Sequence, residues 1–388
     1  MKYSILIPTR NGASYLPYAV ESVLSQPYED CELLVSVNHS TDNSLEILKK
    51  INDPRLKILI PPKPLSMSGH YEWLLKHAIG DWVTIVGDDD GVMPYFFKRL
   101  DSILQKWPKI LAITCRSAHY FWEGYHDDVS SKILDYESTP IERIYSSKWS
   151  LLQILAGIKN WDFLPKLYTN GVIHSSVIQE ILNKSNHKFF YEQTPDVYST
   201  VAIATTTSRF LRIETPLFWT GSSPKSVGYS FAKKINKESS LRADEFIKMS
   251  KTDHVTLAPC INMEMWEQAF SQVYCYSALC ALPFPLKRFK NKGITYLVFG
   301  SIYSKVMQGN QTLQTIYRQQ IDSLHLKFFI LRCIPFLLQV LRMLTKPLER
   351  YNYLIKLRKH KKNRVSISSN DYKKVPNLCA ASQFISQK

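Results

Sequence analysis

The 388-residue sequence lacks the patterns of several common classes of site. Its seven cysteines form no CxxC pair and no two histidines have metal-ligand spacing on one helix, so neither a disulfide framework nor a zinc site is expected. Neither GxGxxG nor GxxxxGK[ST] occurs, which removes support for dinucleotide and P-loop nucleotide sites. Zinc-finger spacing and RNP-type aromatic motifs are also absent, so nucleic acid is not an expected partner.

Long uninterrupted apolar runs are scarce as well. Residues 1–10 hold one lysine and a short apolar stretch, which suits a first buried strand better than a signal peptide, and we expect a cytoplasmic protein. Residues 324–345 are strongly apolar but broken by Lys327, Arg332, Pro335 and Arg342, so a transmembrane helix is not expected. Interspersed bases predict a helix lying in the membrane interface. The alternative is a buried helix that packs on the catalytic domain.

Negative charge is in short supply, and the net charge is +16. Half of this excess lies in residues 346–374, which hold ten lysines or arginines against two acidic residues. Such a stretch suits an anionic membrane surface, and we therefore expect the chain to work at the cytoplasmic face of the inner membrane. Residues 346–388 are predicted to be a basic, flexible tail.

The first 115 residues alternate short β-rich apolar runs with amphipathic helical patterns. The predicted strands are Ser4–Pro8, Leu33–Val37, Leu56–Ile60, Trp82–Val86 and Leu111–Cys115. This alternation predicts an α/β fold with a mostly parallel sheet flanked by helices. Residues 116–147 show no clear periodicity and are predicted to be a long loop. We place a catalytic domain at residues 1–230 and a helical region at residues 231–345.

Three consecutive aspartates, Asp88, Asp89 and Asp90, follow the fourth predicted strand. They would repel one another strongly unless a cation lies among them. Mg²⁺ or Mn²⁺ takes oxygen ligands, usually one or two carboxylates together with substrate phosphates. The cluster therefore predicts a metal–diphosphate site, because ligands bind beyond the carboxyl ends of parallel strands. The alternative is that these acids cap the helix that begins near Pro94.

Several segments in this order resemble the GT-A fold glycosyltransferases of family 2, over about residues 2–228. The opening strand and loop Ser-Ile-Leu-Ile-Pro-Thr-Arg-Asn, the turn Ser-Val-Asn-His-Ser-Thr-Asp and the region Gly-Asp-Asp-Asp-Gly-Val-Met-Pro carry the likeness. The segments Ser-Gly-His-Tyr-Glu-Trp and Ala-Ile-Gly-Asp-Trp add to it. The resemblance implies a Rossmann-like GT-A domain, here with a helical C-terminal extension.

The resemblance also implies roles for individual residues. The donor-binding set is Pro8, Thr9 and Arg10 against the nucleobase, Asn38 at its edge and Asp88 near the ribose. Asp89 and Asp90 would hold the metal. The small residues of the loop Thr220–Gly228 suit a loop that folds over the diphosphate with Lys225 as a counter-charge, and the alternative is a flexible connection. The sequence departs from the family pattern in having Gly87 at the first DxD position and Val37 and Asn38 where many relatives carry aspartate at one or the other position. The preferred nucleobase is left open. The alternative for Asn38 is an ordinary Asx turn.

A sugar transfer also needs a general base for the acceptor hydroxyl. Asp196 lies at the start of a predicted helix, at the chain distance where the family places its acidic base, and Glu192 is the second candidate. The alternative for Asp196 is an acid stabilised by the helix dipole.

The resulting prediction is a metal-dependent, inverting transferase of the hexosyltransferase type. It would move a sugar from a nucleotide-sugar donor to a saccharide or lipid-linked acceptor in cell-surface polysaccharide or lipopolysaccharide synthesis. Two alternatives stay open: a nucleotidyltransferase, and an inactive GT-A-like scaffold or binding module at the membrane.

Overall fold

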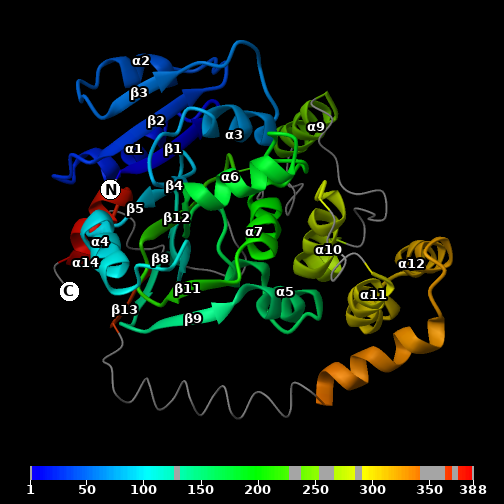
Figure 1. The fold of residues 1–388 in the computed structure, drawn as a ribbon. Coiled ribbons are helices and arrows are strands. Elements are labelled where there is room, and N and C mark those ends of the chain that lie inside the picture. Colours follow the sequence, from blue (N-terminus) through cyan, green and yellow to red (C-terminus); the bar gives the residue numbers. More distant parts are fainter. Residues whose placement is uncertain are drawn as a thin grey trace.

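The computed structural model describes residues 2–125, 132–226, 237–252, 266–284, 291–340, 363–368 and 375–386. It contains two β-sheets with helices packed around them (Figure 1). Predictions for the ends of two segments, residues 227–228 of the loop after residue 220 and residues 341–345 of the apolar segment, lie outside the described residues.

The larger sheet begins as predicted. Its first four strands are β1 (Tyr3–Thr9), β2 (Cys31–Val37), β3 (Leu56–Leu59) and β4 (Trp82–Ile85). They are parallel and lie in the order β3-β2-β1-β4. The intervening helices are α1 (Leu16–Leu24), α2 (Ser44–Lys49) and α3 (Met67–Leu75). β1 and β2 are buried along their whole length, which explains their nearly continuous apolar sequence.

Beyond β4 the sheet becomes mixed. The strand β10 (Gly171–His174), which sequence periodicity did not reveal, runs antiparallel between β4 and β6 (Ala112–Cys115). β11 (Arg209–Ile213) is parallel to β6, and β9 (Glu142–Ser146) forms the edge of the sheet. The predicted fold class, a GT-A-type α/β fold with a helical C-terminal region, is confirmed, although the parallel character is confined mainly to the first half of the sheet.

A second, five-stranded sheet corrects the loop predicted for residues 116–147. Two strands from that stretch, β7 (Ala118–Phe121) and β8 (Lys132–Ser138), join β5 (Gly91–Val92), β12 (Phe218–Ser222) and β13 (Asn363–Ser368) in the order β13-β8-β7-β12-β5. β7 and β8 pair with each other, but β7 also pairs with β12 and β8 with β13, and no local sequence pattern reveals that tertiary pairing. Because β5 follows the aspartate cluster and pairs with β12, this sheet brings the residues after β12 to that cluster.

Helices pack around the larger sheet and on one another. They include α4 (Phe96–Lys106), α5 (Ser147–Leu155), α6 (Ser175–Lys184), α7 (Pro195–Thr206), α9 (Lys237–Thr252), α10 (Trp266–Ala281), α11 (Lys292–Met307), α12 (Gln311–Ser323) and a helix over residues 328–340. As predicted, the region after residue 231 is largely helical where it is described. α10, α11 and α12 lie together on one side of the molecule (Figure 1) and share one continuous apolar core with α5 and α7.

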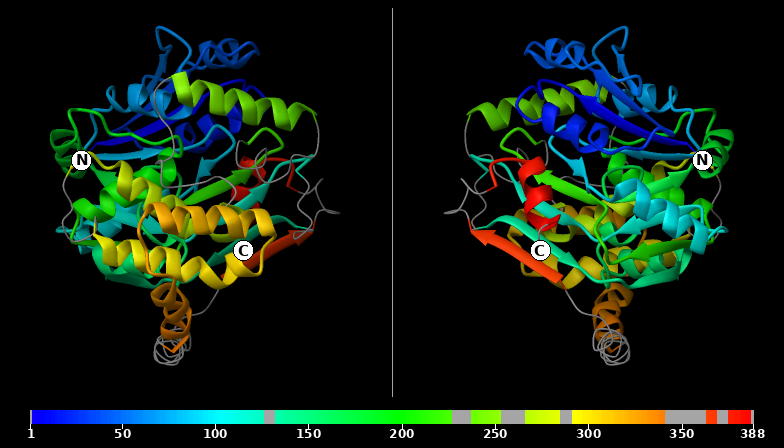
Figure 2. Two further views of the ribbon diagram at one scale, coloured as in Figure 1. Left: turned by 90° about the vertical axis from the view of Figure 1, so that its right-hand side faces the viewer. Right: turned by 90° about the vertical axis from the view of Figure 1, so that its left-hand side faces the viewer.

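At residues 363–368 and 375–386 the C-terminal segment differs from the flexible tail predicted for residues 346–388, and residues 346–362 and 369–374 of that prediction lie outside the described residues. β13 pairs with β8, and α14 (Leu378–Ser386) packs against α1, on the side of the molecule opposite to α10 (Figures 1 and 2). The Tyr120 hydroxyl donates to the Val375 carbonyl, and Trp219 Nε1 donates to Ser382 Oγ. The prediction relied on the basic composition of residues 346–374. It overlooked the apolar residues that follow, which are buried against the second sheet.

We expect Leu378→Ala to lower the free energy of unfolding by about 2–4 kcal/mol, the usual cost of removing a buried leucine side chain. Leu378 is 1% exposed and belongs to the cluster that contains Tyr120, Trp122 and Trp219. Urea denaturation followed by circular dichroism measures this change. Gln383→Ala, on the exposed face of the same helix, is the matched control and should stay within about 0.5 kcal/mol of the wild type. Equal stabilities for both variants would show that α14 does not dock as described.

Candidate functional site

A cavity of about 480 Å³ opens beyond the carboxyl ends of β1, β2 and β4. Most of the predicted site residues line it together: Pro8, Thr9, Arg10, Asn38, Asp88, Asp89 and Lys225. Asp90, Glu192 and Asp196 are not among its lining residues. The topology explains the gathering, because parallel neighbouring strands release their following loops at the same edge of the sheet.

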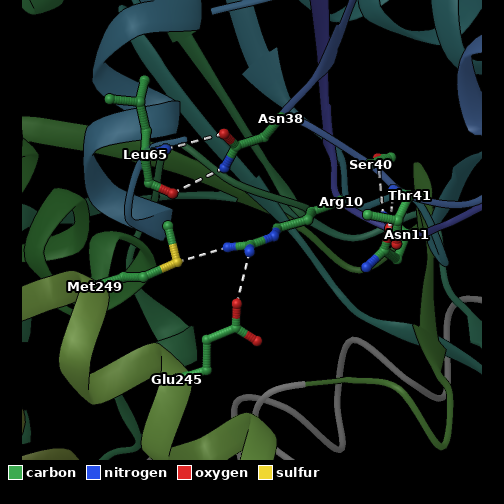
Figure 3. Close-up of polar contacts among 8 residues, drawn as sticks. All are labelled: Arg10, Asn11, Asn38, Ser40, Thr41, Leu65, Glu245 and Met249. Carbon is green, nitrogen blue, oxygen red and sulfur yellow. Dashed lines mark hydrogen bonds and ion pairs between the residues drawn. The ribbon is translucent and has the colours of Figure 1, made fainter. Parts of the chain in front are cut away.

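The loop after β1 is held by the turn after β2. Asn11 has a φ of 59°, a left-handed conformation that asparagine tolerates better than most residues. Its N–H donates to Ser40 Oγ at 3.0 Å, and its Oδ1 accepts from the Thr41 N–H at 2.8 Å (Figure 3). The Ala13 N–H donates to Asp42 Oδ2 at 2.9 Å. These bonds fix the backbone on one side of the cavity.

Asn38 holds another part of the cavity wall. Its Nδ2 donates to the Leu65 carbonyl at 2.8 Å, and its Oδ1 accepts from the Leu65 N–H at 3.0 Å (Figure 3). The side chain is 3% exposed. The amide therefore fixes the loop before α3, which goes beyond the simple Asx turn, and its contact with a nucleobase edge stays a prediction.

Asp88 and Asp89 present carboxylates to the cavity. Asp88 Oδ2 accepts from Thr9 Oγ1 at 2.5 Å, and Asp89 Oδ2 accepts from Ser223 Oγ at 2.7 Å. Burial raises the pKa of Asp88 to about 6, although the Thr9 hydrogen bond opposes the shift. Burial, followed by the charges of Asp90 and Asp88, raises the pKa of Asp89 well above its ordinary value. Both carboxylates thus lack sufficient compensating positive charge.

Asp90 has a different environment from its two neighbours. Its Oδ2 accepts from the Gly87 N–H at 3.0 Å and from Thr169 Oγ1 at 2.5 Å, and its Oδ1 accepts from the Gly221 N–H at 2.7 Å. It is 1% exposed, and burial raises its pKa. Three protein donors therefore give Asp90 a structural role between the two sheets, and metal ligation by it, as predicted from the sequence, gains no support from this geometry.

Gly221 is required at this junction. A Cβ at this position would lie 1.7 Å from the Asp89 carbonyl oxygen, far inside van der Waals contact. The same Asp89 carbonyl accepts from Trp122 Nε1 at 2.8 Å. The close approach of β12 to the aspartate cluster thus depends on the absence of a side chain.

The donor set suits a divalent cation that is completed by a ligand. Among the described residues, no group of three or more His, Cys, Asp or Glu side chains could hold a metal ion unaided. Mg²⁺ and Mn²⁺ need no such cage, since they commonly take one or two carboxylates, with phosphate and water oxygens as the remaining ligands. Asp88 and Asp89 match that requirement, and a cation would relieve the repulsion that raises the pKa of Asp89.

Five ring side chains line the cavity without having been assigned a role from the sequence: Tyr15, His70, Tyr71, Tyr168 and Phe246. His70 Nε2 lies 2.7 Å from Ser36 Oγ, and burial lowers the pKa of His70 to about 3, so the imidazole is neutral. The rings of Tyr71 and Tyr168 stack with centroids 6.0 Å apart. The pair His70-Tyr71 occurs in a segment that carried the family resemblance, but Tyr168 precedes the unrecognised strand β10 and had no sequence signal.

Asp196 lies at the first turn of α7, as predicted. It is partly exposed, and burial raises its pKa while the charge of Lys166 opposes the shift. After burial itself, the charge of Asp196 is the largest contribution to the raised pKa of Tyr71. Asp196 therefore lies near Tyr71 and Tyr168, which line the cavity, but it does not line the cavity itself.

Glu192, the alternative base, is fully buried against α10. Its carboxylate accepts hydrogen bonds from the Ser277 and Thr194 hydroxyls, and burial raises its pKa to about 8. The side chain connects the start of α7 to α10 and does not line the cavity. This geometry favours Asp196 over Glu192 as the base.

Glu192 predicts a pH dependence of stability. Because its folded-state pKa lies above its unfolded-state value of 4.5, ionisation costs more in the folded state, and stability should fall as pH rises from about 5 to 8. The ionisation of Glu192 should lower the free energy of unfolding by on the order of 3 kcal/mol, and Glu192→Gln should abolish that decrease. Urea unfolding at pH 6 and pH 8.5 measures the difference. Glu180→Gln, at an exposed acid on α6, should keep the wild-type pH profile, and a wild-type profile in Glu192→Gln would contradict this account.

Residues 4–157 match the family model described as "Glycosyl transferase family 2". An uncharacterized glycosyltransferase of Haemophilus influenzae is 34% identical over 105 residues, which cover 26% of this chain and 42% of that protein. A "GalNAc(5)-diNAcBac-PP-undecaprenol beta-1,3-glucosyltransferase" of Campylobacter jejuni is 28% identical over 108 residues, covering 27% of this chain and 34% of that protein. The chain thus spans less than half the length of these curated relatives.

Among solved structures, residues 1–349 of S. aureus TarS in complex with UDP-GlcNAc are similar at 15% identity and a TM-score of 0.48, covering 82% of this chain and 92% of that one. The sheet order, the aspartate cluster at the end of β4 and the family match over residues 4–157 agree with one another. Residues 4–157 therefore form a domain that is similar to glycosyltransferase family 2.

Proposed function

We propose that the protein is a metal-dependent, inverting glycosyltransferase that takes its sugar from a nucleotide-sugar donor. The observation that carries this proposal is the pair of carboxylates, Asp88 and Asp89, in a 480 Å³ cavity that is also lined by Pro8, Thr9 and Arg10.

In this proposal the donor's nucleoside lies along the loop after β1, and the neighbouring Asn38 keeps the loop before α3 in place. Asp89, with Asp88, holds Mg²⁺ or Mn²⁺, which supplies Lewis-acid stabilisation of the leaving nucleoside diphosphate. Lys225 lines the cavity with its Nζ 3.4 Å from the Asn11 carbonyl, near enough to add positive charge to a bound diphosphate. Of its loop, the structure describes residues up to Ser226.

Asp196 removes the proton from the acceptor hydroxyl as that oxygen attacks the anomeric carbon from the face opposite to the leaving group. Inversion follows from such an in-line displacement. Its position beside Tyr71 and Tyr168, at the edge of the cavity, leaves room for the acceptor outside the donor site. Burial raises the pKa of Asp196 and so makes it a stronger base than an exposed aspartate.

Calorimetric titration with UDP, GDP, CDP and dTDP, with and without Mn²⁺, tests the donor proposal. We expect one of these to bind with a dissociation constant that tightens when Mn²⁺ is present. The result also identifies the nucleobase of the donor, which the sequence leaves open. Binding of nucleoside triphosphates alone would favour a nucleotidyltransferase, and no binding at all would favour an inactive scaffold.

The acceptor side of the proposal is a saccharide or a lipid-linked sugar at an anionic membrane surface. The Campylobacter relative is named for an undecaprenol-linked substrate. Within the described residues no helix is long and apolar enough to cross a bilayer. The helix at residues 328–340 instead exposes Phe329, Phe336 and Leu337 at 77%, 68% and 57%. Phe336 and Leu337 follow Phe329 by seven and eight residues, so the three side chains lie on one face of the helix. Leu331 and Leu338 are buried on the opposite face.

This exposed face predicts peripheral membrane binding. Phe329→Ser combined with Phe336→Ser should reduce partitioning onto vesicles of phosphatidylglycerol and phosphatidylethanolamine by at least about 10-fold, since each phenylalanine loses its apolar insertion. Vesicle co-sedimentation measures the effect. Trp149→Ser, at an aromatic side chain that is 63% exposed on α5, should bind as the wild type does. A wild-type protein that ignores anionic vesicles would overturn the proposed location.

A further inference from the structure

One wall of the donor cavity comes from a part of the chain that carries no family motif. Helix α9 contributes Glu245, Phe246 and Met249 to the lining, opposite the loop after β1. α9 packs against α3, so it reaches the cavity next to the loop that Asn38 fixes. These residues lie more than 200 positions from Arg10 in sequence, so no local pattern connects them to it.

Arg10 is engaged by this helix. Its Nη2 lies 2.6 Å from Glu245 Oε1, and its Nη1 contacts Met249 Sδ (Figure 3). Figure 3 shows the guanidinium group pointing across the cavity toward α9, away from the Asn11 turn. The side chain that the sequence places in the donor-binding set is therefore occupied by a carboxylate that belongs to the protein.

The pair is exposed enough to be broken. The Arg10 and Glu245 side chains are 35% and 53% exposed, and solvent-exposed ion pairs change an equilibrium by no more than about five-fold. A diphosphate carries several charge-assisted acceptor oxygens, and arginine can bind phosphate in a bidentate manner. A bound donor can therefore take over the guanidinium from Glu245 at small cost.

We propose that Glu245 competes with the anionic donor for Arg10, so that α9 sets the donor affinity of this site. The proposal rests on the proposed nucleotide-sugar function. Without donor, the Arg10–Glu245 pair ties α9 to the loop after β1. When the donor's phosphates engage Arg10, that tie is broken, and Phe246 and Met249 remain as the apolar surface that the donor meets on this side.

Removing the competing charge should strengthen binding. Glu245→Gln is expected to lower the dissociation constant for the nucleoside diphosphate about two- to five-fold in the presence of Mn²⁺ at low salt. The advantage should shrink in 0.5 M NaCl, because salt screens exposed ion pairs. Asp244→Asn is the matched control: it removes the same charge from an exposed neighbouring position that does not line the cavity, and its dissociation constant should equal that of the wild type.

Hydrogen exchange of residues 237–252 provides a readout that does not need a ligand. We expect faster exchange in Glu245→Gln than in the wild type or Asp244→Asn, and faster exchange in the wild type once nucleotide is added. Unchanged or weaker nucleotide binding by Glu245→Gln would overturn the proposal, and weaker binding would make Glu245 a donor ligand. If no variant binds any nucleotide, the proposed function fails, whereas nucleotide binding that is equal in all three proteins refutes the competition alone.

Discussion

Replacing Asp89 with alanine is expected to lower the rate of sugar transfer by at least about 100-fold, the usual scale for losing a group that stabilises transition-state charge. Asp89 lines the cavity, and its Oδ2 accepts a hydrogen bond from Ser223 Oγ at 2.7 Å. The remaining capacity of the carboxylate suits a metal ion. A coupled assay measures the rate as the release of nucleoside diphosphate from nucleotide sugars that carry the nucleobase selected by calorimetry.

Two comparisons separate this effect from a loss of fold. Asp81→Asn alters an exposed aspartate before β4, at the other end of that strand, and should leave the rate unchanged. Asp89→Ala should melt no earlier than the wild type, since the substitution also removes repulsion from Asp88 and Asp90. A folded Asp89→Ala variant that retains more than a tenth of the wild-type rate would contradict the metal role.

Asp196→Asn is expected to reduce the transfer rate by about 10²- to 10⁴-fold while leaving donor binding unchanged, because a general base acts on the acceptor and not on the diphosphate. Asp196 is partly exposed next to the tyrosines at the cavity edge, and asparagine keeps its shape without its basicity. Initial rates at saturating donor and acceptor, combined with the calorimetric dissociation constant, separate the two effects.

Glu192→Gln decides between the two candidates that the sequence left open. Its carboxylate faces the Ser277 and Thr194 hydroxyls in the core, so the variant should transfer sugar at nearly the wild-type rate. The opposite pattern, an inactive Glu192→Gln with an active Asp196→Asn, would show that the acceptor approaches from the side of α10.

The sequence was sufficient for the parts of the molecule in which local pattern and tertiary environment agree. β1, β2 and β4 read as strands because they are apolar along their length, and their carboxyl ends had to meet at one edge. The gathering of Thr9, Asn38 and Asp88 around one cavity follows from that rule. The family and the fold class predicted from these motifs are confirmed by the family match and the sheet topology.

Other strands could not be predicted from the sequence, because they are formed by pairing with distant parts of the chain. β10 is four residues long and lies antiparallel within the larger sheet, and β13 pairs with β8 across more than 200 residues of chain. No local periodicity encodes such contacts. Two features of the site could not be predicted for the same reason. Asp90 accepts hydrogen bonds from Thr169 and Gly221, and Arg10 pairs with Glu245, all of which are distant in sequence.

The most direct test of the account is a crystal structure with Mn²⁺ and the nucleoside diphosphate selected by calorimetry. We expect the metal to be bound by Asp89, with Asp88 beside it, and the diphosphate oxygens to complete its coordination. The nucleobase should lie along Pro8, Thr9 and the backbone of Arg10, with the Arg10 guanidinium in contact with the diphosphate. A nucleotide bound outside this cavity, or a metal held without either Asp88 or Asp89, would contradict the assignment of the donor site.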